Sequence, residues 1–128
     1  MKEKGKLESR DRKLDDLKEP FKSKAFELLA RCVESNIPIM IIETLRTEEQ
    51  HQEDIASGHS WVVHSKHQDG LAIDICPYYQ YMEHGDDKLQ WDSSDPIWQS
   101  IGLIGEDLDL TWGGRWQQKD MGHFELKG

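Results

Sequence analysis

The chain has 128 residues and a formal net charge of −9, because 25 acidic residues outnumber 16 lysines and arginines. A chain of this length predicts a single domain over residues 1–128, with residues 1–13 as an N-terminal segment that can be flexible. Residues 36–128 carry only six basic residues against seventeen acidic ones. An acidic majority of this kind argues against nucleic-acid binding, which needs a basic surface.

The sequence contains no apolar run of the length that a signal peptide or a membrane span requires. We therefore expect a cytoplasmic protein that does not insert into a membrane. We also expect it to be a monomer. The spacing of Cys32 and Cys76 matches no zinc or redox motif, so both cysteines are expected to be reduced.

Apolar residues at helical spacing predict a helix from about residue 14 to residue 34, which Pro20 either breaks or starts. The apolar and β-branched run at residues 37–44 is typical of a buried strand. Arg46 would follow the end of this strand.

A capping box formed by Thr47 and Gln50 predicts a short helix that ends near Gly58. Gly70 closes a turn, and residues 71–75 then alternate as a half-buried strand does. In that strand the odd-numbered residues face the core, and the even-numbered ones face the other way.

The aromatic and acidic segment at residues 78–95 indicates a long irregular loop. A helix is expected from about residue 95 to residue 109, with Pro96 in its first turn. Residues 110–112 and 122–126 are the last strand candidates. The sequence therefore predicts an α+β fold, in which helices flank a small antiparallel sheet.

Two clusters of polar residues contain the candidate metal ligands and a further carboxylate. His67 and Asp74 lie seven residues apart across a turn, and Asp120 and His123 lie near the C-terminus. Alternation along the two strands allows the face with Asp74 to meet the face with His123. Two imidazoles and one carboxylate match the ligand set of a catalytic zinc ion, with a second carboxylate nearby.

Each of these residues also has an ordinary interpretation. A lone histidine is more often a surface or core residue than a ligand, and Asp120 resembles common loop chemistry. The joint spacing favours a metal site over these alternatives. The four remaining histidines are not expected to bind metal: His64 would face away from His67, and we expect surface positions for His51, His59 and His84.

Residues 65–74 resemble the Ser-x-His-x-x-Gly-x-Ala-x-Asp element of the D-alanyl-D-alanine carboxypeptidase-like zinc peptidases. Residues 112–116 and 120–125 resemble the second element of that family. The resemblance runs from about Ile41 to the C-terminus and is greatest to the L-alanyl-D-glutamate endopeptidases, which include phage endolysins. It departs from the family at Thr44-Leu45, where Gly-Tyr is more usual.

The resemblance implies a hedgehog-like fold with one Zn²⁺ per chain on the open face of the sheet. By matching positions, it assigns the roles of the five site residues: His67, Asp74 and His123 as zinc ligands, Asp120 as general base, and Arg46 as the group that stabilises the negative oxygen formed during hydrolysis. Arg46 has an alternative role, an ion pair with Glu43 or Glu49.

The implied activity is hydrolysis of the peptide stems of bacterial peptidoglycan, at the L-alanyl-D-glutamate bond. A phage endolysin of this kind would wait in the host cytoplasm and reach the cell wall after the membrane is permeabilised. Two alternatives use the same site: a D-alanyl-D-alanine carboxypeptidase or dipeptidase, and a non-catalytic zinc module similar to the hedgehog domain. Trp112 and Trp116 would line a substrate cleft or pack in the core.

Overall fold

The computed structural model describes residues 10–58, 64–81 and 86–128. Its elements, in chain order, are η1 (Leu14–Asp16), α2 (Phe21–Glu34), β1 (Ile39–Glu43), α3 (Glu48–Ala56), η2 (Lys66–Asp69), β2 (Ala72–Tyr81), β3 (Asp86–Leu89), α4 (Ile97–Asp107), β4 (Leu110–Trp112), η3 (Gly113–Arg115) and β5 (His123–Leu126). Among these elements, no helix is long and apolar enough to cross a membrane.

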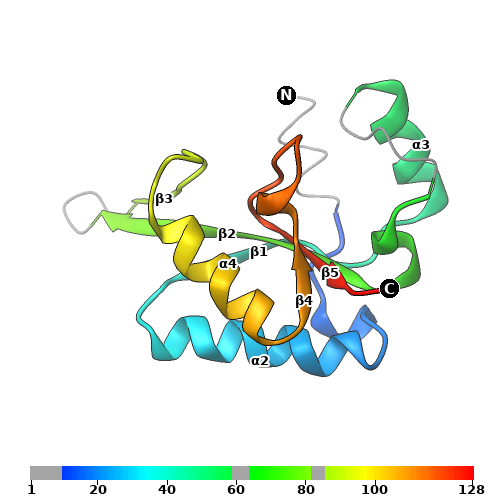
Figure 1. The fold of residues 1–128 in the computed structure, drawn as a ribbon. Coiled ribbons are helices and arrows are strands. Elements are labelled where there is room, and N and C mark those ends of the chain that lie inside the picture. Colours follow the sequence, from blue (N-terminus) through cyan, green and yellow to red (C-terminus); the bar gives the residue numbers. More distant parts are fainter. Residues whose placement is uncertain (1–9, 59–63, 82–85) are drawn as a thin grey trace.

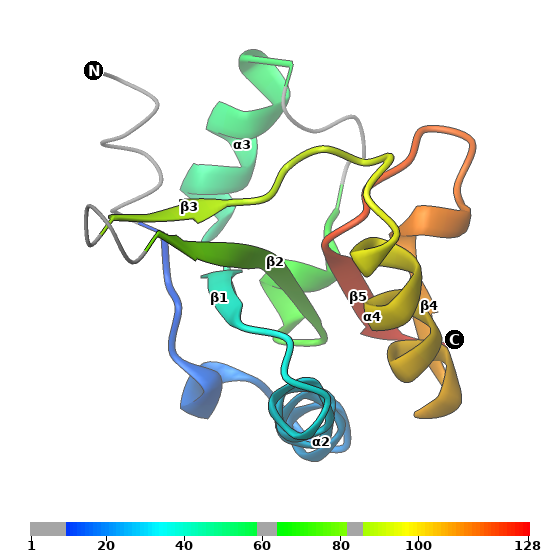
Figure 2. The same cartoon turned by 90° about the vertical axis from the view of Figure 1, so that its left-hand side faces the viewer.

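The long strand β2 organises an antiparallel sheet. Its first half pairs with β1 and β5, and β4 extends the sheet on the far side of β5. Its second half pairs with β3. The helices α2 and α3 lie on opposite sides of this sheet (Figures 1 and 2). The predicted α+β fold, a small antiparallel sheet with flanking helices, is confirmed.

The main core lies between α2 and the sheet. The buried face of α2 consists of apolar residues three to four positions apart, which are Phe21, Ala25, Leu28 and Cys32. They pack against Ile73 and Ile75 of β2. Both cysteines of the chain are buried and not joined in a disulfide.

Pro20 directly precedes α2, so the predicted helix over residues 14–34 is shorter than the apolar pattern suggested. Residues 14–16 form only a 3-10 turn. Proline has no N–H to donate and its backbone angle suits the first turn, so it starts a helix more easily than it continues one.

Two glycines allow α4 to lie close to the sheet. A Cβ atom on Gly102 would lie 2.5 Å from the ring of Trp112, and one on Gly105 would lie 2.4 Å from the ring of Phe124. The two rings stack on each other, with centroids 6.5 Å apart. The backbone of α4 thus contacts the two aromatic rings at Gly102 and Gly105, where any side chain would collide with a ring.

A Gly105→Ala variant is therefore expected to lower the free energy of unfolding by about 1–3 kcal/mol, the usual cost of overpacking a core. Replacing glycine by alanine in an exposed helix interior stabilises a protein by about 1 kcal/mol. At Gly105 the collision with the ring of Phe124 should cost more than this gain. Urea denaturation measures the difference. The control is Ser100→Ala on the exposed face of the same helix, which should be neutral or stabilising. Equal stability of the two variants would contradict the packing argument.

The predicted loop over residues 78–95 is partly wrong. β2 continues to Tyr81 and forms an antiparallel pair with β3, in which Tyr78 lies opposite Leu89. The segment shows no clear alternation of apolar and polar residues, so the strands were missed. Pairing between the two backbones provides their hydrogen bonds whatever the side chains are. Residues 90–95 form turns and irregular structure, as expected.

Candidate metal centre

Three neighbouring strands bring site residues into one row across the sheet. Glu43 of β1 lies opposite Asp74 of β2, and Asp74 lies opposite His123 of β5. An irregularity in the register of β1 between Ile41 and Glu43 places Glu43 in this row. Because Ile73 and Ile75 are buried in the core, Asp74 faces the opposite side of the sheet, where α3 lies.

His67 reaches this row from η2. Ser65 caps η2 and accepts a hydrogen bond from the backbone N–H of His67, and Gly70 ends η2 in the left-handed conformation, at φ 72°. Gly70 suits this position because it has no Cβ to oppose a positive φ. The imidazole Nδ1 of His67 lies 2.8 Å from the carbonyl oxygen of Thr44, and the N–H of Arg46 donates to the carbonyl of His67. These bonds attach η2 to the end of β1.

One ligand atom from each of His67, Asp74 and His123 lies within 4.8 Å of the other two. Asp74 Oδ1 is 3.1 Å from His67 Nε2 and 2.8 Å from His123 Nδ1. The buried His67 Nε2 has no hydrogen-bond partner among the described residues, despite its closeness to Asp74. A buried nitrogen without a partner is costly, and a metal ion would use its lone pair. The three donors therefore fit a metal ion.

The electrostatics of the cluster also suit a cation. Loss of solvent raises the pKa of the Asp74 carboxyl, but the two imidazoles more than offset this and hold that pKa well below its usual range. Burial lowers the pKa of His123, yet hydrogen bonds to Asp74 and Glu125 raise it to about 10. The carboxylates around His123 thus stabilise positive charge between them.

Asp120 lies in the turn before β5, outside the three-residue cluster. Its N–H donates to the carbonyl of Gly113, and its own carbonyl accepts from the N–H of His123. Partial removal of solvent and the negative charge of Asp74 raise the pKa of Asp120 to about 6. The position of Asp120, near these charges but outside the cluster, suits a group that exchanges protons.

The two tryptophans of this region have different surroundings. Trp112 is buried in the core, and its indole N–H donates to the carbonyl of Met121. Trp116 is half-buried, and the centroid of its ring lies 5.1 Å from the centroid of the His123 ring. Of the two interpretations made from the sequence, core packing holds for Trp112, and Trp116 lies beside the site.

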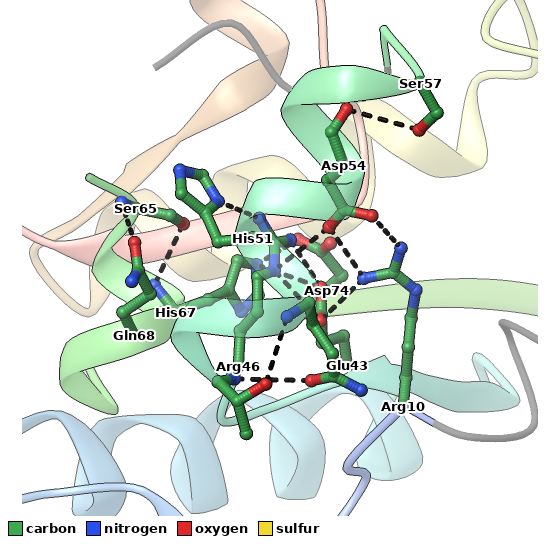
Figure 3. Close-up of polar contacts among 12 residues, drawn as sticks. Arg10, Glu43, Arg46, His51, Asp54, Ser57, Ser65, His67, Gln68 and Asp74 are labelled. Atoms are coloured by element: carbon green, nitrogen blue, oxygen red, sulfur yellow. Dashed lines mark hydrogen bonds and ion pairs between the residues drawn. The ribbon is translucent and has the colours of Figure 1, made fainter. Parts of the chain in front are cut away.

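Arg46 belongs to a buried network of charges next to the metal cluster (Figure 3). Its Nε and Nη2 donate to the two oxygens of Glu43, and its Nη1 lies 3.1 Å from His51 Nδ1. Arg10 bridges Glu43 and Asp54. Of the two ion-pair partners weighed for Arg46, the structure shows Glu43, in a buried position rather than on a solvated face.

The prediction that His51 lies on the surface is wrong, because His51 is fully buried. The inner face of α3 consists of polar residues that contact the charged network instead of an apolar core, so no hydrophobic pattern marks it. His64 is exposed, and its Nε2 lies 2.9 Å from Asp69 Oδ1. His59 and His84 lie outside the described residues.

Asp54 and Arg10 were not expected near the site, and Glu43 was expected only as a possible ion-pair partner of Arg46. A signal for two of them was present: Glu43 is the one charged residue in the strand Ile39–Glu43, and Asp54 lies three positions after His51 on the same helix. Nothing comparable marks Arg10, which lies 33 residues from Glu43 and 44 from Asp54.

The fold and the cluster define a small α+β domain with a His-Asp-His group on one face of its sheet. A model of the D-alanyl-D-alanine carboxypeptidase family matches residues 58–126, which is more than half of the chain. The chain belongs to this family, as the resemblance of its motifs predicted. No curated protein in the comparison matches the chain.

Among solved structures, the chain is similar to the crystal structure of the L-Ala D-Glu endopeptidase ChiX of Serratia marcescens. The TM-score is 0.65 and the sequence identity is 24%, over 89% of this chain and 83% of that chain. The likeness shows that the two proteins share a fold across most of their length.

Proposed function

We propose that the protein is a zinc peptidase that cleaves the peptide stems of bacterial peptidoglycan at the L-alanyl-D-glutamate bond. The family and the fold support a peptidase. The observation that carries the proposal is the convergence of His67 Nε2, Asp74 Oδ1 and His123 Nδ1 on one point. Such an enzyme would act as a cell-wall lysin, and the phage endolysin setting expected from the sequence is part of the proposal.

A zinc ion held by His67, Asp74 and His123 would lower the pKa of a bound water molecule and polarise the peptide carbonyl. Asp120 would accept a proton from the attacking water and return it to the leaving amine. This role requires a carboxylate beside the ligands but not among them, and Asp120 lies in such a position.

Arg46 is proposed to stabilise the negative charge that develops on the carbonyl oxygen. A guanidinium has five N–H donors. Three contacts to Glu43 and His51 involve its Nε, Nη1 and Nη2, so one further N–H remains on each terminal nitrogen. A donor held rigidly in this way is already oriented before the charge forms, which is what makes such a group effective.

Digestion of purified peptidoglycan by the zinc-loaded protein tests the proposed bond. We expect new alanine C-termini and new glutamate N-termini, identified by mass spectrometry, and no such products after treatment with a chelator. A digest without any new termini would contradict the peptidase proposal as a whole.

A second candidate activity, D-alanyl-D-alanine carboxypeptidase, is favoured because it is the activity for which the chain's family is named. It would use the same ligands, but it would release free D-alanine from the end of the stem. The same digest distinguishes the two activities, because only the carboxypeptidase produces the free amino acid without an internal cut.

A further inference from the structure

The second carboxylate beside His123 has no role so far. Glu125 lies two residues after His123 on β5, and both side chains extend from the same face of the strand. Its Oε1 is 2.8 Å from His123 Nε2. The two nitrogens of this imidazole thus face two carboxylates at equal distances, Asp74 at Nδ1 and Glu125 at Nε2.

This symmetry matters because an imidazole must give up one of its two protons to bind a metal, and only the nitrogen that has lost its proton can bind. A proton on Nδ1 would donate to Asp74 and would block the nitrogen that belongs to the cluster. A proton on Nε2 donates to Glu125 and leaves the lone pair of Nδ1 directed toward Asp74 and His67. The acceptor at Nε2 therefore selects the form of His123 that can bind metal.

His67 shows the same arrangement with the nitrogens exchanged. Its Nδ1 lies 2.8 Å from the carbonyl oxygen of Thr44, which leaves Nε2 for the cluster. Thr44 offers a neutral acceptor, whereas Glu125 offers a charged one. A charged acceptor makes the stronger hydrogen bond, as His123 needs because Asp74 competes for its proton.

The carboxylate of Glu125 is itself held in place. Lys66 Nζ lies 3.5 Å from Glu125 Oε2 and also donates to the carbonyl of Leu126. Lys66 begins η2, the element that carries His67. The two oxygens of Glu125 thus have separate partners, and its side chain is only 19% exposed.

We propose that Glu125 is a positioning residue that keeps the proton of His123 on Nε2 and so prepares Nδ1 to bind the metal. This inference rests on the proposed metal site, and it predicts a change in zinc affinity that is measurable without any substrate. Loss of such a partner of a ligating histidine typically weakens metal binding by about 10- to 100-fold.

The test is the zinc dissociation constant, measured at one pH by competition with a chromophoric chelator. We expect Glu125→Ala to bind zinc about 10- to 100-fold more weakly than the parent. Glu125→Gln should show a smaller loss, because the amide oxygen still accepts from Nε2 but carries no charge. The control Glu106→Gln changes a carboxylate that pairs with the exposed Arg115, and it should bind zinc as the parent does.

A second readout follows the proton itself. In the zinc-loaded parent, long-range ¹H–¹⁵N spectra should show the His123 proton on Nε2, and this proton should exchange with water faster in Glu125→Ala. If Glu125→Ala bound zinc as tightly as the parent and its His123 proton exchanged at the parental rate, this inference would be overturned, while the proposed metal site would stand. If that variant does not fold, the same result for Glu125→Gln would overturn it. A parent that binds no zinc would overturn the proposed metal site together with this inference.

Discussion

An Asp120→Asn variant is expected to hydrolyse wall peptides about 10²- to 10⁴-fold more slowly than the parent, the usual contribution of a general acid or base. Asparagine has nearly the same size as aspartate but cannot accept a proton from water at neutral pH. Because Asp120 lies outside the cluster of His67, Asp74 and His123, zinc content should stay at one ion per chain. The measurements are initial rates on a soluble stem peptide and zinc content by atomic absorption.

The matched control is Asp109→Asn. Asp109 also lies in a turn, directly before β4, and pairs with Lys127. The variant therefore removes the same charge as Asp120→Asn, from a residue that has no role in hydrolysis. A fast Asp120→Asn enzyme would show that another group moves the proton. A variant that loses zinc together with activity would show instead that Asp120 supports the metal site.

The second large effect is on stability. Glu43→Ala is expected to lower the free energy of unfolding by about 3–5 kcal/mol, the cost of breaking a buried ion pair by removing one partner. Glu43 is 1% exposed and accepts from both Arg10 and Arg46. Without it, the two guanidinium groups would share Asp54 as their remaining carboxylate in this network (Figure 3). Urea denaturation monitored by tryptophan fluorescence measures the loss.

Glu106→Ala serves as the control, because it removes a carboxylate from an ion pair whose partner, Arg115, is 54% exposed. Ion pairs at the surface contribute little, since water and salt screen them. The contrast between the two variants tests whether water is excluded from the network of Arg10, Glu43, Arg46 and Asp54. Equal losses in the two variants would mean that water reaches Glu43.

The helices and the strand β1 were predictable because local patterns determine them. The capping box of Thr47 and Gln50 is present at the start of α3, with both of its hydrogen bonds. Apolar spacing located α2 and α4, and Pro20 and Pro96 mark their starts. The hairpin of β2 and β3 was not predictable in the same way, because it depends on pairing between backbones rather than on a side-chain pattern.

Part of the candidate site was also readable from local sequence. His67, Gly70 and Asp74 lie within one short segment, where the turn at Gly70 returns the chain toward the strand of Asp74. His123 needed one additional assumption, that its strand pairs with the strand of Asp74, and the register of β2 and β5 confirms this pairing. The sequence therefore predicts that His67, Asp74 and His123 meet, and the role of Asp120 in hydrolysis stays a prediction.

Motif spacing and strand alternation are local properties of the chain, and they were enough to predict which residues form the candidate metal site. The surroundings of those residues, in contrast, depend on how distant segments pack together. Thr44 and Glu125 became hydrogen-bond partners of the two histidines, and His51 became a buried contact of Arg46. Such contacts depend on burial and on register between distant segments, and the identity of a charged residue does not show whether folding will remove it from water.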